Sequence, residues 1–148
     1  MLAKDIMSRD VITVRKDSTI KEVVELLVEH KISGAPVVDE TDRLIGMISE
    51  GDLLYKDRKL QTPAFLEILG GVIYLENPQR LSQDLKKMTA SVVTELMTKK
   101  VFTVREITPV QEIASLMIKR KINRVPVVDE AEKVVGIVSR QDLVRSIA

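Results

Sequence analysis

The sequence predicts an α+β fold made of two similar units, and three observations support this prediction. First, residues 46–53 (GMISEGDL) return as residues 136–143 (GIVSRQDL), at an offset of 90 positions. Second, the match continues upstream without a gap as far as Met7, which pairs with Met97. Third, each copy combines helix-like apolar spacing with short β-like runs. An ungapped match of this length between two parts of one chain indicates a tandem repeat.

The repeat divides the chain into three parts. Residues 1–55 form the first copy, residues 92–148 form the second, and residues 56–91 are an insertion with no counterpart. A unit of roughly 55 residues is small for independent stability. We therefore expect the two copies to pack around one shared core, as a single pseudo-twofold module.

Each copy is expected to begin with a short helix, an extended thread and a longer helix. In the first copy, residues 2–7 predict the short helix and residues 11–14 the thread. Ser18 is predicted to cap a helix over residues 19–30, whereas in the second copy Thr108 caps and Pro109 takes the first helical position. The apolar faces of the two helices are expected at Ile20, Val23, Val24 and Leu27, and at Val110, Ile113, Ala114 and Met117.

Each copy then ends in a β-hairpin and a helix. Residues 36–38 and 44–49 predict two strands around an acidic turn at 39–42, and a helix follows from Glu50. Ser49 and Asp52 have the spacing of a capping box, which stabilises a helix start by about 1 kcal/mol without any ligand. A carboxylate beside free backbone N–H groups also suits a ribose diol, with the hydroxyl and the helix end turned toward phosphate. The spacing leaves both roles open.

The insertion has two interpretations. Residues 63–75 are markedly apolar and contain both Phe65 and Tyr74, while residues 82–88 have the spacing of an amphipathic helix. We expect this segment to cover the module's own core. The alternative is an exposed surface for a partner protein or a second copy, because aromatic side chains in an apolar run are typical interface anchors.

Composition and motifs exclude several classes of function. Lys and Arg number 23 against 22 Asp and Glu, so the net charge gives no general electrostatic attraction to nucleic acid or to an anionic membrane. Few aromatic residues are present for stacking on the bases of single-stranded nucleic acid. With no Cys and one His, a disulfide framework, a thiol nucleophile and a His- or Cys-based metal site are excluded. No catalytic set and no glycine-rich phosphate loop is present, so we expect no enzyme.

The location of the protein is inferred from its N-terminus. Charged residues at positions 4 and 5 interrupt the place where a signal peptide would be apolar, and no apolar stretch reaches membrane-spanning length. We therefore expect a soluble protein of the cytoplasm.

Three repeated motifs together resemble the cystathionine β-synthase (CBS) domain family. They are the thread at 11–14 (VITV), the segment at 31–39 (KISGAPVVD) and the run at 46–53, each matched in the second copy. Tandem pairs of this family are called Bateman modules. The resemblance implies that clefts between the repeats bind adenosine nucleotides (AMP, ADP or ATP) or S-adenosylmethionine, with no catalytic cofactor and no metal ligand assigned.

The resemblance also implies which residues form the two clefts, each built from both repeats. One cleft takes Ser49 and Asp52 with Val101, Phe102, Thr103, Asn123, Arg124, Val125 and Pro126. The other takes Ser139 and Asp142 with Val11, Ile12, Thr13, Ser33, Gly34, Ala35 and Pro36. The aspartates would hold ribose hydroxyls, the serines would approach phosphate, and the threads would flank adenine. Because Arg124 can engage phosphate as a fork while Gly34 cannot, the Asp52 cleft is expected to bind phosphorylated ligands more tightly.

We therefore expect a regulatory sensor that reports an adenosine-containing ligand through a change of shape or assembly. The family resemblance further implies pairing of two modules into a flat homodimer. The alternative is a structural module that binds no nucleotide and recruits a partner protein through residues 63–75.

Overall fold

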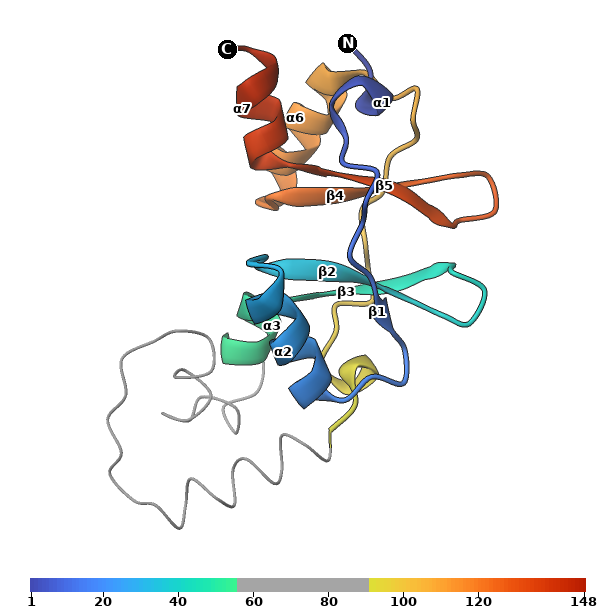
Figure 1. Ribbon diagram of the computed structural model, residues 1–148. Helices are drawn as coiled ribbons and strands as arrows, with labels where there is room; N and C mark the ends of the chain where they lie inside the picture. Colours follow the sequence, from blue (N-terminus) through green and yellow to red (C-terminus); the bar gives the residue numbers. More distant parts are fainter. Residues whose placement is uncertain (56–90) are drawn as a thin grey trace, which may run out of the picture. The chain divides into compact units, whose positions relative to one another are not determined.

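A computed structural model describes residues 1–55 and 91–148 of the protein (Figure 1). The predicted helix at 82–88 and the apolar run at 63–75 lie outside these residues. The elements, in chain order, are α1 (Ala3–Ile6), β1 (Val14–Arg15), α2 (Ile20–Glu29), β2 (Gly34–Val38), β3 (Leu44–Ser49), α3 (Glu50–Tyr55), the 3₁₀ helix η2 (Val93–Glu95), α6 (Val110–Arg120), β4 (Arg124–Val128), β5 (Val134–Ser139) and α7 (Arg140–Ser146). Helix, hairpin and helix recur in both copies, so the predicted α+β class is confirmed.

The described residues form two compact units, and each unit draws on both halves of the sequence. The β2–β3 unit comprises Thr13–Val38 and the described residues of Ile45–Lys99. The β4–β5 unit comprises Met1–Ile12, Asp39–Leu44 and Lys100–Ala148. The N-terminal segment of each repeat thus belongs to the unit that contains most of the other repeat.

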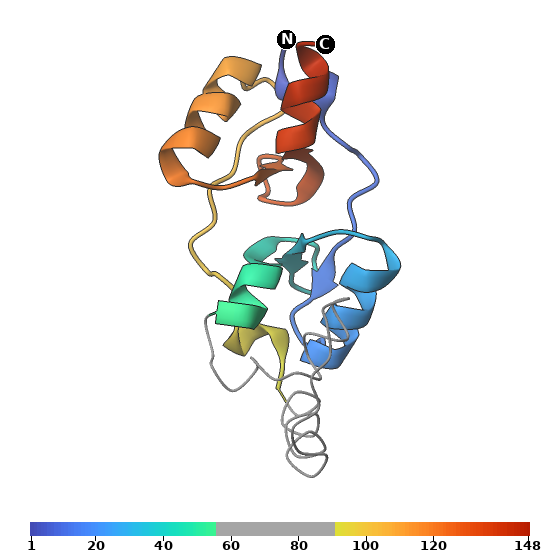
Figure 2. The same cartoon turned by 90° about the vertical axis from the view of Figure 1, so that its left-hand side faces the viewer.

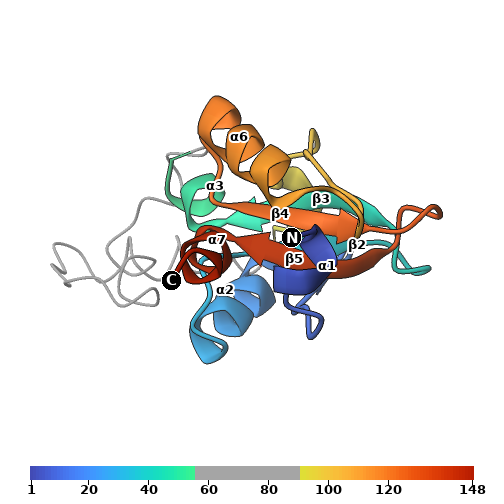
Figure 3. The same cartoon turned by 90° about the horizontal axis from the view of Figure 1, so that it is seen from above.

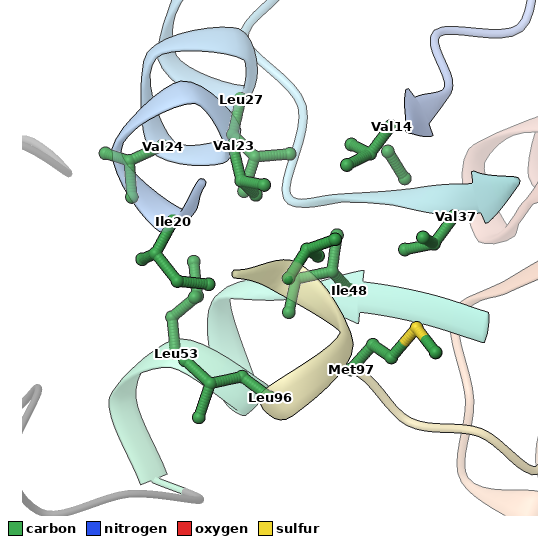
Figure 4. Close-up of a cluster of buried hydrophobic side chains, with 12 residues drawn as sticks. Val14, Ile20, Val23, Val24, Leu27, Val37, Ile48, Leu53, Leu96 and Met97 are labelled. Carbon is green, nitrogen blue, oxygen red and sulfur yellow. The ribbon is translucent and has the colours of Figure 1, made fainter. Parts of the chain in front are cut away.

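In the β2–β3 unit, three strands carry two helices on one face. The strand order is β1-β2-β3, with β1 parallel to β2 and Val14 in register with Val37. Figure 2 shows α2 and α3, in blue and green, on the same side of the strands. Their buried side chains meet those of the sheet in one cluster, whose members in Figure 4 include Ile20, Leu27, Val37, Ile48, Leu53, Leu96 and Met97.

The last two members of that cluster come from the N-terminal segment of the second repeat. Leu96 and Met97 are buried, and the next residue, Thr98, exchanges two backbone hydrogen bonds with Met47 at 2.8 and 2.9 Å. A Cβ atom at Gly46 would collide with the Met97 side chain and crowd the Thr98 carbonyl. A glycine at position 46 therefore lets this segment lie directly against β3.

The β4–β5 unit repeats the same plan. Strands β4 and β5 are antiparallel, and Val104 makes a parallel bridge to Val127, the same relation that Val14 has to Val37. Figure 3 shows α6, α7 and α1 over the two strands. Ala3 and Met7 complete its core, which also contains Ile113, Met117, Val125, Val127 and Val138. Gly136, the counterpart of Gly46, likewise leaves space for a methionine, here Met7.

The hairpin turns of both copies are closed by an aspartate. Asp39 Oδ1 accepts hydrogen bonds from the Thr41 hydroxyl at 2.8 Å and from the backbone N–H groups of Thr41 and Arg43 at 2.9 and 3.0 Å. The Thr41 hydroxyl is the main cause that lowers the pKa of the Asp39 carboxyl. Asp129 holds the N–H groups of Ala131 and Lys133 in the same way.

Both long helices begin one residue later than predicted. Thr19 rather than Ser18 caps α2, because its side-chain oxygen accepts from the Glu22 N–H at 3.2 Å. Pro109 is the N-cap of α6, with an extended ψ of 142°, and is therefore not helical. Thr108 instead closes the preceding turn, where its hydroxyl accepts from the Arg105 N–H at 3.0 Å.

Strand pairing of the thread with β2 involves Val14 and Arg15. The single shared core is wrong for the described residues, whose buried side chains form one cluster in each unit. The predicted face of α2 is buried at all four positions, whereas on α6 only Ile113 and Met117 are fully buried.

Candidate functional site

The first half-site is formed where β3 ends and α3 begins. The Ser49 N–H donates to Asp52 Oδ2 at 3.1 Å, and the Asp52 N–H donates to Ser49 Oγ at 3.4 Å. The Ser49 hydroxyl also donates to Asp52 Oδ2, at 3.3 Å. The capping-box role is thereby confirmed. The Asp52 carboxylate is half-buried in the first turn of α3, and its other oxygen, Oδ1, accepts a hydrogen bond from a different partner.

That partner is Thr98, which the sequence analysis did not select. Its hydroxyl donates to Asp52 Oδ1 at 2.8 Å, across 46 positions of the sequence. Thr98 lies in the segment that packs against β3, three residues before the thread residue Val101. The available signal was weak: at the offset of 90, Thr98 corresponds to Ser8, so a hydroxyl recurs just before each thread.

The second half-site, between β5 and α7, has the same capping box with tighter contacts. Asp142 Oδ2 accepts from the Ser139 N–H at 2.7 Å and from the Ser139 hydroxyl at 2.9 Å. Its Oδ1 lies 3.8 Å from Nη1 of Arg145, an arginine whose side chain is 75% exposed. Within their own units, the two carboxylates therefore have different neighbours at Oδ1: the Thr98 hydroxyl at Asp52 and the exposed Arg145 guanidinium at Asp142.

The predicted site residues are distributed over both units. The β2–β3 unit holds Ser49 and Asp52 together with Thr13, Ser33, Gly34, Ala35 and Pro36. The β4–β5 unit holds Ser139 and Asp142 together with Val11, Ile12, Val101, Phe102, Thr103, Asn123, Arg124, Val125 and Pro126. Each unit thus carries the hydroxyl and carboxylate of one predicted cleft and most of the thread and pre-proline residues of the other.

Within each unit, the pre-proline segment lies beside the start of the following helix. The Glu50 N–H donates to the Ser33 carbonyl at 2.9 Å, and the Arg140 N–H donates to the Asn123 carbonyl at the same distance. Arg124 is the cross-strand partner of Ser139 in the β4–β5 register. The structure therefore brings Ser33 next to the capping box of Ser49, and Arg124 next to that of Ser139.

Some predicted site residues belong to the core. Ala35 and Val125 are at most 1% exposed. The carbonyl of buried Pro126 accepts a hydrogen bond from the Val104 N–H at 3.1 Å. The side chains of Ala35 and Val125 are thus enclosed, so any contact that these two residues make with a ligand must come from their backbone.

Phe102, at the centre of the second thread, is flanked by cations. The Arg120 guanidinium lies 4.6 Å from the ring centroid, and the Lys100 ammonium lies 6.0 Å from it. These are cation–π distances. The first thread has Ile12 at this position, so only the second thread offers an aromatic face. Arg120 was not predicted, because a spacing of 18 residues carries no local signal.

The described part of the chain contains neither a cluster of metal ligands nor a helix that could span a membrane. Within residues 1–55 and 91–148, His, Asp and Glu side chains do not gather in any group of three that could hold a metal ion. No helix in the same residues combines the length and the apolar character needed to cross a membrane.

Comparison with known proteins gives close matches over the whole chain. MJ1426 of Methanocaldococcus jannaschii is 33% identical over 99% of this chain and 91% of its own length. The chain spans only 22% to 60% of several longer relatives.

Two solved structures contain ligands. The CBS domain pair of MJ0100, in complex with 5′-methylthioadenosine and S-adenosyl-L-methionine, is 30% identical with a TM-score of 0.72, and each chain is covered completely. CBSX2 in complex with AMP is 30% identical with a TM-score of 0.74, over 99% of this chain and 95% of that one.

The family assignment follows from these matches and from the repeated motifs. The model of the CBS domain matches residues 3–59 and 93–148, which are the two copies found in the sequence. Structural neighbours of the chain are CBS domain pairs. The chain therefore belongs to the CBS domain family and contains two copies of that domain.

Proposed function

We propose that this chain is a regulatory module that binds an adenosine-containing ligand, either an adenosine nucleotide (AMP, ADP or ATP) or S-adenosylmethionine. The observation that carries the proposal is the pair of half-buried carboxylates, Asp52 and Asp142, presented at the same place in both copies. Similar CBS pairs have been solved with AMP and with S-adenosyl-L-methionine, which supports this ligand class. The role is regulatory rather than catalytic.

The chemistry of a half-site fits a ribose diol. In each copy a carboxylate at the start of a helix accepts hydrogen bonds from the serine of its capping box. Ribose hydroxyls would bind the same carboxylate through charge-assisted hydrogen bonds, in exchange for contacts that it makes without ligand. The thread of the other repeat, with Phe102 in one cleft and Ile12 in the other, would flank adenine. A ligand that contacts both units favours the arrangement in which both halves of a cleft meet.

The direct test is a ligand panel read by thermal unfolding of the full chain. A ligand at 100 times its Kd stabilises the folded protein by about 2.7 kcal/mol, which raises the melting temperature by several degrees. We expect AMP, ATP or S-adenosylmethionine to produce such a shift and GMP to produce none. No shift with any adenosine ligand up to millimolar concentration would contradict the proposal.

Arg124 is expected to select phosphate. Because a guanidinium binds phosphate oxygens as a fork, Arg124→Ala should weaken AMP binding about tenfold while changing adenosine binding little. Calorimetric titration of both ligands measures the difference. Lys21→Ala is the matched control, since it removes one positive charge from an exposed ion pair with Glu25 on α2. Equal losses for AMP and adenosine would show that Arg124 has no phosphate role.

The alternative function, recruitment of a protein partner through residues 63–75, rests on a segment outside the described residues. It differs from the proposal in predicting no thermal shift with any adenosine ligand. Pairing into a homodimer also stays a prediction. Exposed apolar side chains on α6 and α7, Ile118 and Val144, and Ile147 beyond them, would suit such a contact, and sedimentation equilibrium would give the mass directly.

A further inference from the structure

We propose that Arg120 is a positioning residue for Phe102, and that it holds the phenyl ring in the orientation in which the ring meets the adenine of the ligand. The inference rests on the proposed function and adds to it a residue outside the two predicted clefts. It makes Arg120 a determinant of base binding, whereas Arg124 is expected to bind phosphate. The observation behind it is the position of the Arg120 guanidinium over the Phe102 ring, 4.6 Å from the ring centroid.

The backbones of both residues are firmly placed within the β4–β5 unit. Arg120 is the last residue of α6, and the next residue, Lys121, is the C-cap, whose N–H donates to a carbonyl one turn earlier in the helix. Phe102 lies two residues before Val104, whose N–H and carbonyl form hydrogen bonds of 3.1 and 3.0 Å with the backbone of β4. With both backbones held, the contact between the two side chains fixes the orientation of the ring.

The charge of Arg120 is not used elsewhere in the described part of the chain. Within residues 1–55 and 91–148, its guanidinium forms no ion pair and no hydrogen bond. A planar, weakly hydrated guanidinium is well suited to lie on an aromatic face. The contact with Phe102 is therefore the interaction that holds this side chain in place.

The cations over the ring leave its edge for the ligand. The Lys100 ammonium also lies over Phe102, 6.0 Å from the centroid. Phe102 is half-buried, so part of the residue is accessible. The edge of a phenyl ring carries partial positive charge, and it packs favourably against the electron-rich face of another aromatic system. An edge-to-face contact with adenine therefore requires no uncovered face of the Phe102 ring.

The first repeat provides a natural comparison. At the offset of 90 positions, Ile12 corresponds to Phe102 and His30 corresponds to Arg120. The aromatic ring and the permanent cation are thus present together in the second repeat and absent together from the first. Base binding through an oriented ring is accordingly assigned to the cleft that contains Phe102.

The test compares Arg120→Ala with Lys119→Ala by calorimetric titration. The full chain is used in an Asp142→Ala background, so that the Asp52 cleft reports alone. We expect Arg120→Ala to weaken the binding of AMP and of adenosine equally, by about two- to fivefold, the range for an exposed cation–π contact. Lys119 is the matched control, because it is an exposed cation in the same last turn of α6 and does not lie over the ring. Lys119→Ala should change neither affinity.

A double-mutant cycle separates positioning from a merely structural role. In a Phe102→Leu background, Arg120→Ala should cause no further loss of AMP affinity, because the ring that it orients is gone. Arg120→Lys, which keeps a cation that can lie over the ring, should retain part of the affinity.

Three results would overturn the inference and leave the proposed function standing. They are unchanged binding in Arg120→Ala, a loss for AMP with adenosine unchanged, and an undiminished loss in the Phe102→Leu background. The second result would make Arg120 a phosphate contact, and the third would show that it acts without the ring. A parent protein that binds neither AMP nor adenosine would overturn both the inference and the proposed function.

Discussion

Replacing Asp52 with alanine is expected to weaken AMP binding at least tenfold. In the proposed complex, the Asp52 carboxylate accepts hydrogen bonds from two ribose hydroxyls. Each hydrogen bond to a charged group contributes about 1.5 to 3 kcal/mol, and a loss of about 1.4 kcal/mol already weakens affinity tenfold. Calorimetric titration of Asp52→Ala and of Asp142→Ala measures the effect at each cleft. We expect the Asp52 change to cost more for phosphorylated ligands, because Arg124 is assigned to the same cleft.

The control for this prediction must remove a cap without removing a ligand contact. Asp5 provides it, because its carboxylate accepts from the Leu2 N–H at 2.8 Å at the start of α1. Asp5→Ala therefore removes a capping hydrogen bond comparable to that between Ser49 and Asp52, at a cost of about 1 kcal/mol in stability. If Asp5→Ala and Asp52→Ala weakened AMP binding equally, Asp52 would be a helix cap and nothing more.

Ile113→Ala is expected to lower the free energy of unfolding by about 2 to 5 kcal/mol. Its side chain is fully buried in the β4–β5 unit, among Met7, Met117 and Val125. The loss combines the transfer of its methyl and methylene groups to water with the cavity that remains. Denaturant unfolding followed by circular dichroism gives the value.

Ile107→Ala is the matched comparison in the same unit. This isoleucine is 71% exposed and lies outside any helix, so its truncation should change stability by no more than about 0.5 kcal/mol. Similar losses for the two variants would mean that Ile113 is not the core residue that the structure describes.

The fold could be predicted because its signals are local. The buried face of α2 follows from apolar spacing, and the hairpins follow from β-branched runs around acidic turns. The first residue of α2 could not be predicted, because Ser18 and Thr19 are both good N-cap residues. The backbone conformation places Thr19 at the N-cap position. The placement of Met7 and Met97 was not predictable, because no local pattern indicates that the N-terminal segment of each repeat packs into the unit that contains most of the other repeat.

The candidate site was predictable only in part, for the same reason. Ser49 and Asp52 are three residues apart, so their capping box can be read from spacing alone. The hydrogen bond from Thr98 and the contact of Arg120 with Phe102 join segments that are far apart in sequence. Such contacts depend on how the elements pack, and the pattern of a single sequence does not contain that information.

The decisive measurement is a crystal structure of the full chain grown with AMP. We predict AMP with its ribose hydroxyls within hydrogen-bond distance of the Asp52 carboxylate, its adenine beside residues 101–103 and its phosphate near Arg124. Such a complex would show that one ligand joins residues of both repeats. AMP bound away from Asp52 and Asp142, or clear density for both clefts with no nucleotide at saturating concentration, would contradict the proposed function.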